Sequence, residues 1–214
     1  MFPITLTKAL ASASANNIAL SQTPLSGAAL AINGALAANG VATLDTQRRV
    51  LFTFGNEGSD RTVVITGTNM FGAVISETVA IPAGAGSTAY TINDYLTVTS
   101  LLTGGGAWTH AVTVGTNGIG STQWVSSNTQ VTPGNTSILA VTVSGSVTST
   151  LEWTNDPLCP IGNIPWYVPS ATVLTLSSGN ATITWPITGW RMTITTGTGT
   201  ARMTGAQGGV SQGG

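Results

Sequence analysis

The stretch RTVVITGTNMFGAVISETVAI (61–81) decides the fold class of this chain. It predicts two strands, residues 61–69 and 73–81, joined by a turn at Asn-Met-Phe-Gly. Side chains in the second strand alternate between two faces, because successive residues of a strand point to opposite sides. Glu77 is the one charge between the ends of this hairpin. One face carries Val74, Ser76, Thr78 and Ala80, and the other carries Ile75, Glu77, Val79 and Ile81.

Short predicted strands separated by turns continue on both sides of the hairpin. Residues 17–44 are short apolar runs broken by Asn33-Gly34 and Asn39-Gly40, which favour turns because both residue types tolerate positive φ. A helix over the Ala-rich part is the alternative, but Gly and Asn interrupt every turn of it. Further strands are predicted in 48–55, 89–102, 107–115, 138–154, 171–187 and 190–207, the last range closing as a hairpin at Thr-Gly-Thr-Gly.

Strands about every 12 residues, with turns between them, indicate an all-β protein of the sandwich or barrel type. A polar stretch with one Pro-Gly separates two halves of similar style. We therefore expect two β-sandwich domains, Ig-like or jelly-roll-like, with an arm before them and a tail after them. The expected ranges are an extended N-terminal arm (1–16), a first domain (17–127), a second domain (135–207) and a flexible Gly-rich tail (208–214).

Charged residues make up only 6% of the 214 residues, against roughly 25% in ordinary soluble domains. The hydrophobic fraction of 42% argues against disorder away from the chain ends. A formal net charge of −1 gives little self-repulsion. The composition therefore favours self-association into a homo-oligomer or a place in a larger assembly.

Several partners are disfavoured by the composition. Six basic residues make no stripe for a phosphate backbone, which argues against nucleic acid. No run of 18 apolar residues predicts a membrane-spanning helix, and the N-terminus lacks the compact apolar region of a signal peptide. Cys159 is the only cysteine, so no internal disulfide forms, and its apolar, Pro-flanked setting predicts a small buried side chain.

The sequence offers no catalytic, cofactor-binding or metal-binding set. His110 is the only histidine, which excludes multi-His metal sites and predicts a structural role. Glu57 and Asp60 share a loop with Arg61, which reads as a turn with local charge pairing rather than a calcium site. The six tryptophans are expected to be core or domain-interface anchors. We therefore expect no enzyme.

The densest charge cluster is Asp45, Arg48 and Arg49. One interpretation is a local ion pair at the start of a strand, which contributes only about 0–1 kcal/mol when exposed. The other is a docking contact, because Arg is enriched in protein interfaces. Both interpretations stay open at this point.

The stretch VATLDTQRRVLFTFGNEGSDRTVVITGTNMFGAVISETVAI (41–81) resembles a pattern of tailed-bacteriophage structural proteins. GWRMTITTGTGTARMTGAQ (189–207) is similar to a second common element of such proteins, a strand with an Arg before a Gly-Thr-Gly hairpin. The likeness covers about residues 17–125 and 135–207 and occurs in head-decoration, head-fibre and tail-associated proteins. Its matching positions in the first stretch are Asp45, Arg48, Arg49, Gly67, Thr68, Gly72, Ser76, Glu77 and Thr78.

The resemblance implies a virion structural protein and transfers no catalytic residue. We expect a capsid cement or decoration protein that binds the major capsid protein or other virion proteins and is assembled in the host cytoplasm. A head fibre, a tail component or an adsorption protein that binds a carbohydrate or receptor is the alternative.

Overall fold

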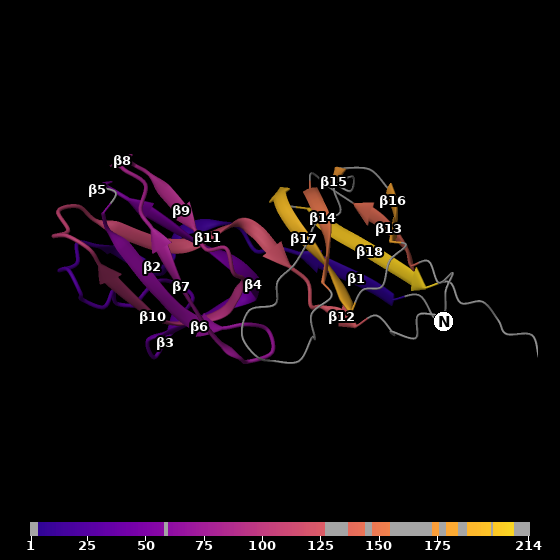
Figure 1. The fold of residues 1–214 in the computed structure, drawn as a ribbon, viewed down its shortest axis with the longest axis horizontal. Coiled ribbons are helices and arrows are strands. Elements are labelled where there is room, and N and C mark those ends of the chain that lie inside the picture. Colours follow the sequence, from indigo (N-terminus) through magenta and orange to yellow (C-terminus); the bar gives the residue numbers. More distant parts are fainter. Residues whose placement is uncertain are drawn as a thin grey trace, which may run out of the picture. The chain divides into compact units, whose positions relative to one another are not determined.

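The computed structural model describes residues 4–57, 60–126, 137–143, 147–154, 173–175, 179–183, 188–197 and 199–207 (Figure 1). These residues form strands, turns and bends and contain no helix, which confirms the all-β prediction and excludes the helical alternative for residues 17–44. The expectations for the tail (208–214), Cys159, Trp166 and Trp185 lie outside the described residues.

The chain divides into two compact units. Of the described residues, those in 12–119 form unit 2, whereas unit 1 combines residues 4–11 with those from Gly120 onward. The chain therefore starts in unit 1, completes unit 2 and returns to unit 1. The domain ranges 17–127 and 135–207 stay a prediction.

Unit 2 is organised around one long strand. The strand order is β11-β4-β10-β6-β7, with β2 paired to β11, β3 and β9 paired to β4, and a separate β5–β8 pair. Glycine and short polar turns connect these strands, as expected for antiparallel neighbours. The strands are β2 (Ser14–Gln22), β3 (Ala37–Ala38), β4 (Val41–Phe54), β5 (Asn56–Glu57), β6 (Thr62–Thr68), β7 (Val74–Ala80), β8 (Gly84–Ala85), β9 (Thr88–Tyr90), β10 (Tyr95–Gly104) and β11 (Val112–Ser121).

The predicted hairpin of residues 61–81 is confirmed as β6 and β7. Their antiparallel register runs from Thr62 opposite Ala80 to Thr68 opposite Val74. Gly72 closes the turn with a φ of 79°, a conformation that glycine adopts without steric penalty. The face that carries Ile75, Val79 and Ile81 packs into the core of unit 2, together with residues from β2, β4, β10 and β11.

The two Asn-Gly pairs serve different purposes. Asn39 and Gly40 have φ values of 52° and 77° and join β3 to β4, as a type I′ hairpin turn requires. Gly34 does not have positive φ. A Cβ on Gly34 would lie 2.3 Å from the backbone carbonyl carbon of Asn17, so this position requires glycine for its small size.

Two sheets contribute to the core of unit 1. One has the order β1-β18-β13-β16, and in the other β14 lies between β15 and β17, with β12 paired to β17. Buried side chains from both sheets form one cluster. The strands are β1 (Ile4–Ala9), β12 (Val125–Ser126), β13 (Ser137–Val143), β14 (Val147–Thr154), β15 (Val173–Thr175), β16 (Gly179–Ile183), β17 (Gly189–Gly197) and β18 (Thr200–Gln207).

The hairpin predicted for residues 190–207 is wrong. β17 pairs with β14, whereas β18 pairs with β1 and β13 in the other sheet. Met192 of β17 and Met203 of β18 are both buried in the same core, so the chain crosses from one sheet to the other after Gly197. β17 and β18 thus lie in different sheets, because burying an apolar side of each strand in one core requires the two strands to face each other.

The extended N-terminal arm is not confirmed. Ile4–Ala9 forms β1 and pairs along its whole length with β18, from Ile4 opposite Gly205 to Ala9 opposite Thr200. Residues from Ser14 onward belong to β2 of unit 2. The range expected to be an arm therefore contributes one strand to each unit.

Gly67→Ala tests the close packing of β6 against β10. A Cβ at this position would lie 1.9 Å from the carbonyl oxygen of Thr97, which is backbone and cannot move aside without disturbing the strand pair. We expect a loss of about 1–3 kcal/mol of unfolding free energy, measured by urea denaturation. Gly118→Ala in β11 is the matched control, because nothing lies within 4 Å of its Cβ position. Equal stability of the two variants would contradict this account.

Candidate docking surface

The outward face of three neighbouring strands in unit 2 carries no charged side chain. On β7 this face consists of Val74, Ser76, Thr78 and Ala80, all exposed. We call the outward residues of β6, β7 and β10 the hydroxyl face, because Thr and Ser are its commonest members. The other members of the hydroxyl face are Thr62, Val64, Thr66 and Thr68 on β6 and Thr97, Thr99, Ser100 and Leu102 on β10.

The hydroxyl groups of this face bond to one another and to the strands beneath. Thr66 Oγ1 lies 3.2 Å from Ser76 Oγ, and Thr68 Oγ1 lies 2.7 Å from Thr97 Oγ1. Ser76 Oγ also donates to the carbonyl of Ile65 at 3.0 Å. Paired hydroxyls lose less solvation when a partner covers them, because buried polar groups are costly mainly when their hydrogen bonds are unmade.

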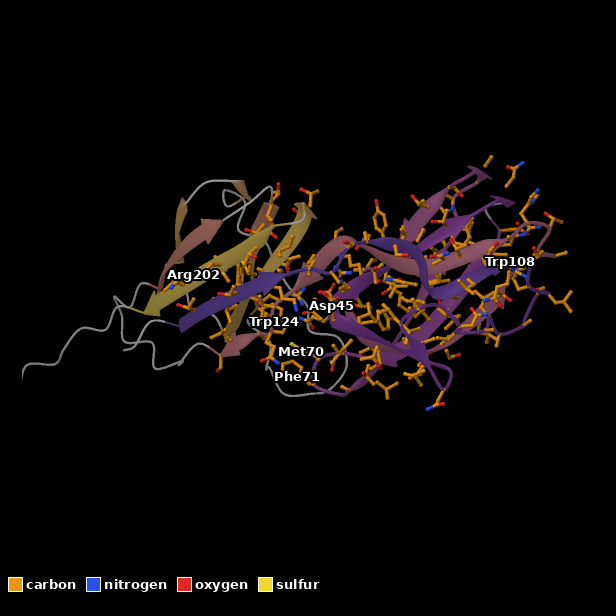
Figure 2. All side chains as sticks on the ribbon, turned by 180° about the vertical axis from the view of Figure 1, so that it is seen from behind. Asp45, Met70, Phe71, Trp108, Trp124 and Arg202 are labelled. Atoms are coloured by element: carbon orange, nitrogen blue, oxygen red, sulfur yellow. The ribbon has the colours of Figure 1, made fainter. Side chains whose placement is uncertain are left out.

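A structured turn ends the hydroxyl face. Asn69 Oδ1 accepts hydrogen bonds from the backbone N–H groups of Phe71 (2.9 Å) and Ala73 (3.1 Å). Phe71 is 36% exposed and Val74, the first residue of β7, is 71% exposed. Figure 2 shows Met70 and Phe71 at this turn, with Trp108 toward the opposite end of unit 2. The turn therefore presents apolar groups next to a flat uncharged surface.

Glu77 is the single charge of the hairpin, and it points away from the hydroxyl face. Its Oε1 accepts from the backbone N–H of Ile92 at 2.6 Å. Its Oε2 accepts from the backbone N–H and the Nδ2 of Asn93 at 2.9 and 2.8 Å. One carboxylate thus anchors the connection between β9 and β10 to β7. The only charge within this hairpin is structural, which leaves the outer face uncharged.

The predicted charge cluster lies at an irregularity in β4. Tyr95 of β10 is opposite Arg48 while Thr97 is opposite Thr43, so four residues of β4 face one residue of β10. Such a bulge redirects the side chains on the longer strand. Asp45 is one of these four residues (Figure 2), and Arg48 is the paired residue that follows them.

The three residues of this cluster differ in their burial and contacts. The Arg48 side chain is 1% exposed, and its Nε lies 3.1 Å from Oδ1 of Asp45, which is 29% exposed. Burial lowers the pKa of Arg48, while the charge of Asp45 acts in the opposite direction. Arg49 is half-buried on the other side of the strand. Arg48 is thus a structural residue of unit 2, and the docking interpretation is left with Asp45 and Arg49.

Tyr95 lies opposite Arg48 in the strand register and is fully buried. Its hydroxyl has no hydrogen-bond partner among the described residues. Burial raises the pKa of Tyr95, and the negative charge of Glu77 raises this pKa further. The phenol therefore stays neutral at physiological pH and acts as part of the core.

A second buried ion pair, which sequence reasoning did not single out, lies in unit 1. Arg191 Nε donates to Glu152 Oε2 at 2.7 Å, and both side chains are under 5% exposed. The guanidinium carbon of Arg191 lies 4.7 Å from the ring centre of Trp124, within the range of cation–π attraction. The sequence signal for this pair was one acid, Glu152, in β14 and one base, Arg191, in β17, each the single charged residue of its strand.

The other residues considered in the sequence analysis either make local contacts or are buried. His110 is exposed and its Nδ1 lies 2.9 Å from Thr109 Oγ1. Asp60 pairs with Arg61, as the sequence predicted. Among the described residues, Trp108, Trp124 and Trp190 are buried, which confirms the core assignment for them.

In the described part of the chain, no three His, Cys, Asp or Glu side chains gather as a metal site. The same residues include no helix able to cross a membrane. No protein-family model, curated protein sequence or solved structure matches this chain. The function of this chain is therefore inferred from its surface chemistry and its sequence pattern.

Arg48→Ala and Arg49→Ala should differ in stability. Loss of Arg48 leaves Asp45 without its partner and removes a buried side chain, so we expect a loss of about 2–3 kcal/mol, below the 3–5 typical of fully buried pairs. Arg49→Ala should change unfolding free energy by less than about 1 kcal/mol. Urea denaturation of both variants measures the difference, and similar losses would refute the assignment of Arg48 as the buried partner.

Glu77→Gln tests the anchoring of the β9–β10 connection. Gln offers one acceptor oxygen where the carboxylate offers two, so at least one N–H donor of Ile92 or Asn93 loses its partner. We expect a loss of about 1–3 kcal/mol and faster hydrogen exchange at these two amides. Asp60→Asn is the control, since Asp60 is 65% exposed and its loss should matter little. Unchanged exchange at both amides would contradict the anchor.

Proposed function

We propose that this chain is a non-enzymatic structural component of a tailed-phage particle. Its role is that of a capsid cement or decoration protein, which binds the head lattice and stabilises it. The partners are the major capsid protein or other virion proteins, together with further copies of the chain. In this proposal the two units act as two β-sandwich domains. The protein is assembled in the host cytoplasm and resides in the virion.

The hydroxyl face is the observation that supports this proposal most directly. It is uncharged and rich in small side chains, its β7 residues are exposed, and several of its hydroxyls are already paired. Covering such a surface requires no charge desolvation and immobilises few long side chains. These properties suit a permanent contact that is repeated many times, because each copy needs only a modest gain to stay bound.

The composition and the sequence pattern support the same role. With 6% charged residues and a net charge of −1, the chain has little electrostatic protection against association. The structural charges Arg48, Glu152 and Arg191 are buried, so they contribute little to the surface. The motifs of residues 41–81 and 189–207 add the resemblance to phage structural proteins.

A head fibre, tail or adsorption protein is the second candidate. Apolar side chains exposed on unit 2 favour it, among them Leu25 (80%) and Ile92 (72%) in loops and Tyr90 (51%) at the end of β9. A carbohydrate site of the usual kind presents aromatic rings to solvent. Tyr90 is such a ring, whereas Trp108, Trp124 and Trp190 are buried. Binding of the purified chain to a glycan array would favour this second candidate.

Thr78→Glu tests the proposed function at the middle of the hydroxyl face. Thr78 is exposed on β7 opposite Val64, so a carboxylate there should leave folding intact. An unpaired charge at a covered contact should weaken binding by about 2–5 kcal/mol, which is roughly 30-fold or more.

The measurement is the number of copies bound to empty heads of the phage that encodes the chain, counted after sedimentation, beside the melting curve of the free variant. Thr88→Glu on β9 is the control, because Thr88 is exposed but lies off the hydroxyl face. We expect the parent and the control to bind in proportion to the major capsid protein, and Thr78→Glu to bind far less. A parent chain that does not bind heads, or binds as only a few copies, would overturn the cement role.

A further inference from the structure

The first strand of the chain belongs to a unit that is otherwise built from its second half. Among the described residues before Gly120, only 4–11 lie in unit 1. The chain then passes through Leu10–Ala13 into β2 of unit 2. β1 is thus joined to the rest of unit 1 by pairing rather than by a neighbouring turn, as Figure 1 shows for β1 beside β18.

None of the side chains described for β1, residues 5–9, is fully buried. Among the described residues, β1 is the edge strand of its sheet and pairs with β18 through six residue pairs. Thr5, Thr7 and Ala9 are exposed, and Leu6 is only partly buried against the core. By contrast, Ala201 and Met203 of β18 are fully buried. The backbone pairing with β18 is therefore a main part of the attachment of β1, whereas β18 is fixed in the core.

Removal of β1 would expose the pairing edge of β18. An unpaired edge strand is a template for another strand of suitable register. β1 of a second copy has the right sequence by identity, and exchange would rebuild the same six pairs with no net loss of contacts. Short connections favour such exchange, and the four residues of Leu10–Ala13 span at most roughly 14 Å, so the two copies must be close neighbours.

We infer that β1 is an exchangeable strand: when copies are crowded together, β1 of each copy pairs with β18 of the other. In dilute solution the strand pairs within its own chain, because the local concentration of its own β18 is higher. On a surface that holds many copies this advantage disappears. The inference goes beyond the proposed function, since it applies to any assembly that concentrates the chain.

Thr5 and Thr204 provide a direct test, because they are opposite in register and their Oγ1 atoms lie 3.1 Å apart. Cysteines at such facing positions can form a disulfide. All variants carry Cys159→Ser, which removes the only native cysteine. Thr5→Cys and Thr204→Cys chains with different affinity tags are co-expressed and oxidised. Each chain has one cysteine, so a Thr5→Cys chain linked to a Thr204→Cys chain reports exchange between copies.

We expect several-fold more of this linked product than from Thr5→Cys co-expressed with Thr88→Cys, which measures random collision. A second arm uses the Thr5→Cys/Thr204→Cys double variant, oxidised in dilute solution so that β1 is locked to its own β18. Gel filtration should show the locked chain as a monomer at concentrations where the Cys159→Ser parent associates, and a reductant should restore association.

Linked product no greater than in the control, or a locked chain that associates as fully as the parent, would overturn the inference. Neither arm uses phage heads, so failure of the cement role would leave these results unchanged. Conversely, failure of exchange would leave the binding of single copies to heads unaffected.

Discussion

Unit 2 depends on β4, because this one strand is the shared pairing partner of β3, β9, β10 and β11. The bulge opposite Leu96 divides its fourteen residues into two parts. The first part pairs with Thr97 and Val98 of β10, and the second pairs with β9 through Leu51–Thr53. The bulge thus lets one strand serve two sets of partners, with Phe52 and Phe54 buried beyond it.

Three of the charged side chains that the structure describes, Arg48, Glu152 and Arg191, are buried. Arg48 lies beside Asp45 of the same strand, whereas Glu152 pairs with Arg191 across β14 and β17. The half-buried Glu77 anchors the β9–β10 connection, so Glu77 and the Glu152–Arg191 pair each hold one strand to another segment. The surface of β6, β7 and β10 is then left to Thr, Ser and small apolar side chains. A low-charge chain of this kind gains specificity in its fold and, at the same time, a surface suited to permanent contacts.

Unit 1 joins segments that lie far apart in the sequence. β18, near the end of the described chain, pairs with β1 at the beginning. Contacts between such distant segments form late, because a long loop must close first. A strand at the sheet edge with no fully buried side chain among those described is the element that the inferred exchange would take from a second copy. The six pairs are the same within one chain or between two copies.

Local sequence is enough to predict the all-β class, the β6–β7 hairpin with its glycine turn, the Asn39-Gly40 turn and the uncharged outer face. These features follow from local alternation and turn chemistry, which a short window contains. The folded chain was needed to show that β17 and β18 lie in different sheets, because this depends on which core buries Met192 and Met203. It also decided the burial of Arg48, which follows from the bulge opposite β10, and the pairing of β1 with β18. Each of these results rests on partners far away in the sequence, and alternation within one strand carries no information about which distant strand will pair with it.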